Sequence, residues 1–211
     1  MWHYFFALLW TLLVSVYALA QDRVKLPTTY SDSIQKELRP FYNLSAGHMS
    51  DLLTGEVVSQ GKVDTPAPKT QQMLLFVSGV HPRNCTKVMR KLSLYENYHQ
   101  YMDFIKDSTY NDKTQLFTFS IDHSLLPFPM IVKFKIPRIT KAGHYPFVFE
   151  DGFLKDLKGT IIVHEIGKFC LLGLKADWRG PETKIPDIVF GTFVQTVGKL
   201  GLDHLIRVSL F

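Results

Sequence analysis

Cysteine is scarce in this chain, since only Cys85 and Cys170 occur among its 211 residues. Two cysteines cannot build a Cys-rich metal cluster, and the absence of a C-x-x-C pair excludes thioredoxin-like redox chemistry. A single disulfide can form between them in an oxidising compartment. We expect the alternative, in which both cysteines are buried free thiols.

Runs of like charge are also absent. The net charge is +5 and the pI is about 9.1. Lys and Arg are nevertheless dispersed among acidic residues, and the sequence contains no run of four or more consecutive basic residues. A nucleic-acid ligand requires a basic stripe, so we expect no nucleic-acid partner.

Motifs for catalysis are missing as well. His164-Glu165 begins like a metalloprotease H-E-x-x-H helix, but Lys168 stands where the second His belongs. The stretch around Ser78 lacks the first glycine of a nucleophile elbow. We therefore predict no catalytic residue, no metal site and no cofactor. His99, His144 and His204 are the histidines whose positions would suit a cavity, and we expect each to be a hydrogen-bonded structural residue.

One long apolar run opens the chain and ends at Ala18-Leu19-Ala20. It is short for the roughly 20 residues of a membrane span, and the A-x-A ending is typical of a cleaved signal peptide. The segment before it lacks Lys and Arg, which leaves an uncleaved anchor as the alternative. We predict a signal peptide over 1–20, cleavage after Ala20, and a secreted or periplasmic protein.

After this segment, residues 21–60 are expected to form a helical lead-in. Ser31 and Ser45 are predicted to cap short helices over 32–38 and 46–53. Residues 61–211 are expected to form the main domain. It begins with a turn-rich connector or edge segment, followed by a buried strand over 73–80 and two short helices broken near Leu94.

Five further strand-like segments follow at 114–122, 128–138, 144–151, 159–166 and 168–178. Short turns between them indicate antiparallel pairing. A long apolar helix is predicted from about 187 to 207, with Gly191, Gly198 and Gly201 inside it. Alternation places bulky apolar residues on one face of the sheet, and we expect the other face to be wetted.

Three stretches carry a family resemblance: LSLYENYHQYMDFIKDS, FEDGFLKDLKGTIIVHEIGKFCLLGLKADW with its Gly152–Gly159 step, and the Ile-Pro-introduced helix IPDIVFGTFVQTVGKLGLDHLIRV. Over about residues 50–208 the chain resembles exported bacterial members of the START-like (SRPBCC) superfamily of polyketide cyclases, dehydrases and lipid-transfer proteins. The resemblance implies an α+β helix-grip fold. In that fold a curved, seven-stranded antiparallel sheet wraps around the C-terminal helix and encloses an apolar cavity.

The resemblance implies that the inward-facing residues of the strands and of the helices line the cavity. These are Tyr98, Phe117, Phe119, Met130, Phe134, Tyr145, Phe147, Phe149, Leu172, Leu174, Trp178, Phe190, Phe193 and Val197. The expected ligand is a lipid-like, sterol, quinone or aromatic molecule. We also expect a monomer that makes transient contact with a membrane surface. The alternatives are a cyclase or dehydratase that uses polar cavity residues, and a solid-core interaction domain.

Overall fold

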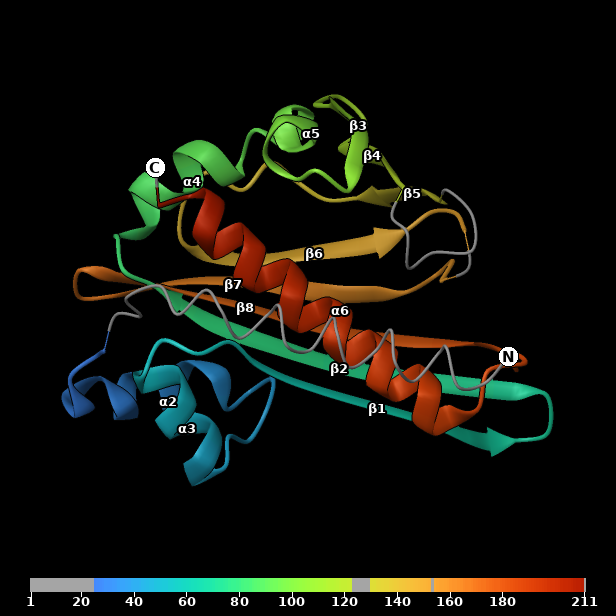
Figure 1. Ribbon diagram of the computed structural model, residues 1–211, viewed down its shortest axis with the longest axis horizontal. Coiled ribbons are helices and arrows are strands. Elements are labelled where there is room, and N and C mark those ends of the chain that lie inside the picture. Colours follow the sequence, from blue (N-terminus) through green and yellow to red (C-terminus); the bar gives the residue numbers. More distant parts are fainter. Residues whose placement is uncertain (1–24, 123–129, 153, 211) are drawn as a thin grey trace, which may run out of the picture.

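The computed structural model describes residues 25–122, 130–152 and 154–210 (Figure 1). The predicted signal peptide and its cleavage site after Ala20 lie outside these residues. In the part of the chain that is described, no helix combines the length and apolarity needed to cross a membrane.

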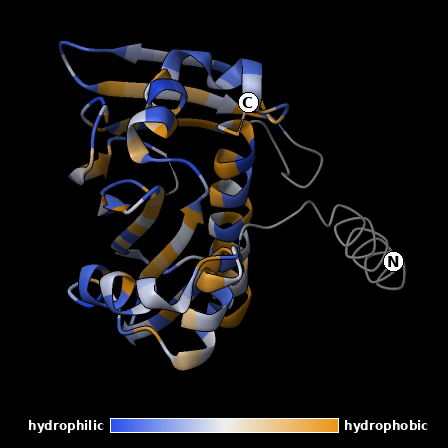
Figure 2. Cartoon of the chain, turned by 90° about the vertical axis from the view of Figure 1, so that its left-hand side faces the viewer, coloured by the Kyte–Doolittle hydropathy of each residue, from blue (hydrophilic) through white to orange (hydrophobic). Residues whose placement is uncertain are grey.

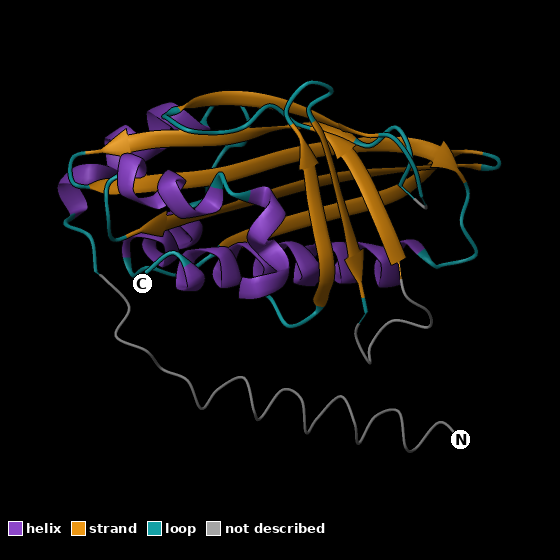
Figure 3. Cartoon of the chain, turned by 90° about the horizontal axis from the view of Figure 1, so that it is seen from above, coloured by secondary structure: helices purple, strands orange, loops and turns teal. Residues whose placement is uncertain are grey.

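One antiparallel sheet forms the centre of the fold, with the strand order β1-β2-β8-β7-β6-β5-β4-β3. The strands are β1 (Val58–Ala67), β2 (Thr70–His81), β3 (Ile105–Asn111), β4 (Leu116–Ile121), β5 (Met130–Lys135), β6 (Gly143–Phe149), β7 (Lys158–Ile166) and β8 (Phe169–Pro181). Figure 3 shows the sheet curving over the long C-terminal helix.

Over the described residues the sheet has eight strands, whereas the family resemblance implies seven. The sequence patterns do not predict regular strands at the two edges of the sheet, β1 and β3. β1 contains Gly61 and Pro66, which interrupt its pattern, and it was expected only as a connector or edge segment. β3 begins at Ile105, which falls at helical spacing from Met102, so the sequence pattern does not separate the start of this strand from the preceding helix.

The helices are short except for the last. They are η1 (Thr28–Tyr30), α2 (Ser31–Leu38), α3 (Ala46–Leu53), α4 (Cys85–Leu92), η2 (Tyr95–Asn97), α5 (Tyr98–Tyr101) and α6 (Asp187–Val208). Ser45 caps α3 as predicted, because its hydroxyl accepts a hydrogen bond from the backbone N–H of His48. Ser31 is not a cap, since α2 begins at Ser31 itself and lacks a side-chain cap.

The long helix α6 confirms the prediction for residues 187 to 207 and packs on β1 and β2 (Figure 1). Two glycines allow this close approach. A Cβ atom on Gly61 would lie 2.9 Å from the carbonyl oxygen of Gly191, and one on Gly198 would lie 2.7 Å from a methyl group of Val77. The buried Gln71 side chain fixes the start of α6 by donating a 2.6 Å hydrogen bond to Asp187.

The inner face of the sheet carries the larger core cluster, to which Phe117, Phe147, Leu172, Trp178 and Phe190 belong. The prediction that Cys85 and Cys170 are free thiols is wrong, because they form a disulfide. Asn84 caps α4, which places Cys85 at the first helical position beside β8. Sequence alone could not show that these two positions meet, since 85 residues separate them.

The outer face is not simply wetted, which corrects a second expectation. α2 and α3 cover part of it and build a separate core cluster with residues of β2, β7 and β8, including Ile34, Leu38, Phe76, Ile162 and Leu171. The helices of the lead-in therefore pack on the outer face of the sheet, opposite the face that carries α6 (Figure 1).

Candidate functional site

One row of inward-facing residues runs across the middle of the sheet. Val77 of β2 pairs with Leu174 of β8, Leu174 with Ile161 of β7, and Ile161 with Tyr145 of β6. Val77 lies beneath α6 and is buried, whereas the other three residues are only partly buried. Ile162, the neighbour of Ile161 that faces outward, is 0% exposed. The centre of the inner face is thus partly open to solvent. A fully packed core would bury these residues.

An aromatic wall continues this open row onto β4, β5 and β6. Phe134 stacks on Phe149 with 5.2 Å between ring centroids, and it meets Phe117 edge-on at 5.1 Å. Phe117 is buried, but Phe119, Phe134 and Phe149 remain partly open to solvent. The result is a continuous apolar surface of aromatic rings, the kind of lining that holds small apolar ligands.

The free side of α6 supplies the opposing wall. Gln195 exchanges hydrogen bonds with Ser59 of the edge strand β1, so the opposite side of the helix looks across the sheet toward β8 and the strands beyond. Phe193 and Val197 lie on that opposite side and are 50% and 52% exposed. Figure 2 shows hydrophobic residues recurring along the length of α6.

A gap in the packing supports the same arrangement. A Cβ atom on Gly201 of α6 would find no other atom within 4 Å, whereas one on Gly198 would clash with Val77. Gly201 lies between the buried side of α6 and the side that carries Val197. Space therefore remains beside Gly201 on this side of the helix.

Both ends of this open region are closed. At one end Trp178 is buried and packs edge-on against Phe190, so its ring closes this end of the site instead of lining an open cavity. At the other end α4 covers β7 and β8, and Leu172 and Val163 are buried there. We define the open site as the surface between these ends, formed by Leu174, Ile161, Tyr145, Phe119, Phe134, Phe149, Phe193 and Val197.

Three tyrosine hydroxyls around the inner core donate hydrogen bonds to backbone carbonyl oxygens. Tyr98 donates to the carbonyl of Leu92 at 2.7 Å, Tyr95 to Pro137 at 3.1 Å and Tyr145 to Lys141 at 2.8 Å. Burial raises the pKa of Tyr98 well above its usual value, so this hydroxyl stays protonated. These groups fix the wall in place and are poorly suited to proton transfer.

The three candidate histidines lie in different environments. His144 lies on the outer face, 2.7 Å from Glu37, and His99 is exposed and 2.8 Å from the hydroxyl of Ser108. His204 of α6 is partly buried and bonds through Nε2 to the carbonyl oxygen of Tyr101 at 3.0 Å. Among the described residues, no group of three or more His, Cys, Asp or Glu side chains is placed to hold a metal ion.

A fourth histidine, His81, was not singled out from the sequence. It is fully buried at the end of β2, and its Nδ1 accepts a hydrogen bond from the backbone N–H of Arg83 at 3.0 Å. The ring lies close to the backbone of Ile206 and Ser209 at the end of α6, and its Nε2 has no hydrogen-bond partner among the described residues. Burial lowers the pKa of His81 to about 4, so the ring is neutral at pH 7.

Most predicted lining residues reach the inner face. Those in the inner cluster are Tyr98, Phe117, Phe119, Phe134, Tyr145, Phe147, Phe149, Leu172, Leu174, Trp178 and Phe190. Phe193 and Val197 lie outside that cluster, on the free side of α6, and the Met130 side chain is not among those described. Sequence reasoning missed Ile161, because Ile161 and Ile162 are adjacent and alternation cannot tell which faces inward. The role of all these residues in ligand binding stays a prediction.

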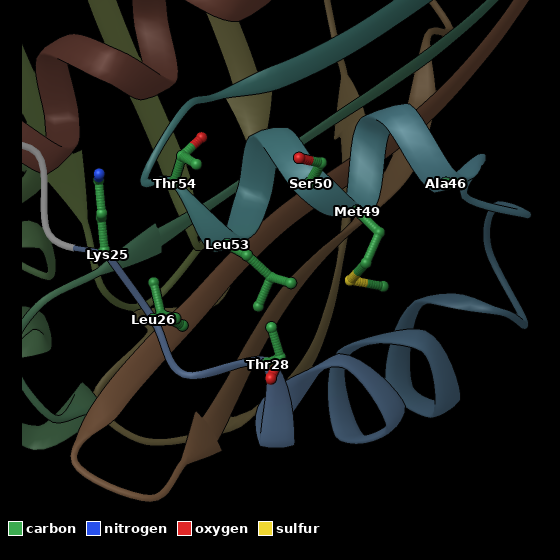
Figure 4. A pocket seen from close by; sticks show the side chains of 8 residues that line it. All are labelled: Lys25, Leu26, Thr28, Ala46, Met49, Ser50, Leu53 and Thr54. Carbon is green, nitrogen blue, oxygen red and sulfur yellow. The ribbon is translucent and has the colours of Figure 1, made fainter.

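A separate pocket of about 410 Å³ lies on the lead-in (Figure 4). It is formed by the segment Lys25 to Thr28 and by α3, where Met49 and Leu53 contribute apolar side chains. The backbone N–H of Leu26 donates to the carbonyl of Leu53 and ties the two sides together. Lys25 is the only charged residue among the described residues that line it, and we assign no function to this pocket.

The sequence matches no protein-family model and no curated protein. Solved structures do match. The Zhui aromatase/cyclase from Streptomyces sp. R1128 aligns with a TM-score of 0.52 at 8% identity, covering 65% of this chain and 93% of that one. Ara h 8.0201 aligns with a TM-score of 0.51 at 9% identity, covering 66% and 98%.

An uncharacterized protein from Bacillus thuringiensis also aligns, with a TM-score of 0.51 at 13% identity, covering 65% of this chain and 99% of that one. At such low identity these likenesses establish architecture alone. Together with the strand order and α6, they show that this chain has the START-like helix-grip fold.

Proposed function

We propose that this protein is an exported carrier or binding protein for a hydrophobic small molecule, which occupies the open site between α6 and the inner face of the sheet. The observation that carries the proposal is the partial exposure of Ile161 and Leu174, which are apolar partners at the centre of the sheet. Covering such surface with a ligand yields about 25 cal/mol per Å².

Lipids, sterols, quinones and aromatic molecules share the chemistry that this surface favours. Its described lining is aliphatic and aromatic, and the rings of Phe134 and Phe149 offer faces for stacking. The cyclase or dehydratase alternative needs at least two free polar groups converging deep in the site. The engagement of Tyr95, Tyr98 and Tyr145 with backbone carbonyls supports binding over catalysis.

Export is supported by two independent features. The apolar start of the chain ends in an A-x-A pattern, and Cys85 and Cys170 form a disulfide, which persists in oxidising compartments and is rare in the cytosol. Secretion, the monomeric state and transient contact with a membrane surface stay predictions.

Native mass spectrometry of protein purified from its own host tests the proposal. We expect a bound mass that organic extraction removes and that chromatography identifies as an apolar molecule. Protein that repeatedly carries no such molecule, and that fails to bind added 2-methoxynaphthalene in a calorimetric titration, would overturn it.

A further inference from the structure

Resting on the proposed function, we infer that His204 is the polar anchor of the site. Its Nδ1 would accept a hydrogen bond from a hydroxyl group on the ligand, so that the favoured ligands are apolar alcohols or phenols.

The position of His204 on α6 is the first argument. It lies seven residues after Val197 and eleven after Phe193, which are two and three helical turns, so the three side chains share one side of the helix. Phe193 and Val197 are half exposed along the open site. His204 therefore lies at the C-terminal end of the same apolar side.

The contacts of His204 show that this side faces across the sheet. Its ring meets the ring of Phe104 edge-on at 5.7 Å, and its Nε2 lies 3.0 Å from the carbonyl oxygen of Tyr101. Tyr101 ends α5 and Phe104 directly precedes β3, the strand at the far edge of the sheet from β1. The imidazole thus bridges α6 and the opposite edge of the grip.

The tautomer follows from this hydrogen bond. A carbonyl oxygen can only accept, so Nε2 carries the proton and donates to Tyr101. In the neutral ring Nδ1 then holds a lone pair, and no described residue hydrogen-bonds to it. A ligand hydroxyl can donate to this lone pair, whereas an ether or a hydrocarbon cannot.

The protein offers few competing anchors at this site. The hydroxyls of Tyr98 and Tyr145 already donate to backbone carbonyls, and the Trp178 N–H donates to the carbonyl of Lys155 at 3.0 Å. An acceptor at one end of an otherwise apolar surface selects for one donor group on the ligand, because an unpaired polar group loses affinity on burial.

The test compares two matched probes, 2-naphthol and 2-methoxynaphthalene, by calorimetric titration of the full chain at pH 7.5. We expect 2-naphthol to bind about three- to tenfold more tightly, the effect of one net hydrogen bond. His204→Phe should abolish this preference while 2-methoxynaphthalene still binds. His204→Gln should restore part of it, because an amide can both donate to Tyr101 and accept from the ligand.

His48→Phe is the control, since His48 lies in α3 on the outer face and contacts Gln60. It should leave both affinities unchanged. Equal binding of the two probes by the wild type, or a preference that persists in His204→Phe, would overturn the role of His204 and leave the proposed site standing. Failure of both probes to bind would count against the proposed function itself.

Discussion

Ile161 and Leu174 are cross-strand partners in the middle of an eight-stranded sheet, yet both keep part of their surface open to solvent. Central positions on a covered face are normally among the most buried in a domain. Leu171 of β8 and Ile162 of β7 show this on the outer face, where each is 0% exposed. The inner face therefore has unfilled space next to α6, over Ile161 and Leu174.

Filling this room should block binding. Leu174→Trp and Ile161→Trp each place a large ring in the open row, so we expect the affinity for 2-methoxynaphthalene to fall at least about tenfold, which corresponds to about 1.4 kcal/mol. Stability should change by less than the roughly 1–3 kcal/mol that overpacking a filled core costs. Calorimetric titration and urea unfolding measure the two effects.

The matched control is Ile131→Trp, because Ile131 lies on β5 facing outward and is 62% exposed. It should bind the probe like the wild type. Unchanged affinity in Leu174→Trp and Ile161→Trp, or severe destabilisation of both, would show that the inner face is filled and would argue for a solid-core domain.

The disulfide between Cys85 and Cys170 should be a major source of stability. It closes a loop with a sequence separation of 85 residues, and cross-links of this size stabilise proteins by about 2–5 kcal/mol. We expect the double variant Cys85→Ser/Cys170→Ser to lose stability in this range, measured by urea unfolding. Reductant should destabilise the wild type by a similar amount and leave the double variant unaffected. A wild type insensitive to reductant at full reduction would contradict the prediction.

The inner face was predictable because alternation assigns a face to each strand residue without reference to its neighbours. Phe117, Phe119 and Phe134 obey this rule and lie inside. α6 was predictable from its length and apolar periodicity. The rule fails where two apolar residues adjoin, as at Ile161 and Ile162.

Other features depend on contacts that no local pattern encodes. The docking of α2 and α3 on the outer face brings Ile34 and Leu38 against strands that follow far along the chain. The Cys85–Cys170 pairing depends on the register that places α4 beside β8. Both edge strands carry exposed polar residues, so their hydrophobic signal is weak.

Two glycines of α6 should respond oppositely to alanine. Gly201→Ala meets no atom within 4 Å and gains helix propensity, so we expect stabilisation of about 0.5–1 kcal/mol. Gly198→Ala receives the same gain, but its methyl group lies 2.7 Å from a methyl of Val77, a stiff and buried β-branched residue. We therefore expect Gly198→Ala to be less stable than Gly201→Ala by at least about 1 kcal/mol in urea unfolding. Equal stabilities would show that α6 is not held tightly against β2.

His81 should make the protein sensitive to mild acid. Burial lowers its pKa from 6.5 to about 4 in the folded state, so between these values the unfolded chain binds the proton and the folded chain does not. The resulting stability is fully present above about pH 6.5 and is lost as the pH falls toward 4. The shift corresponds to about 3 kcal/mol.

Urea unfolding of the wild type and His81→Gln at pH 7.5 and pH 4.0 isolates this contribution. Both proteins share every other titrating group, so the wild type should lose about 3 kcal/mol more than the variant between the two pH values. The variant is expected to be the less stable of the two at pH 7.5, because it disturbs the bond to the Arg83 N–H. Identical losses in both proteins would mean that His81 titrates normally, and hence that the junction between β2 and the end of α6 admits water.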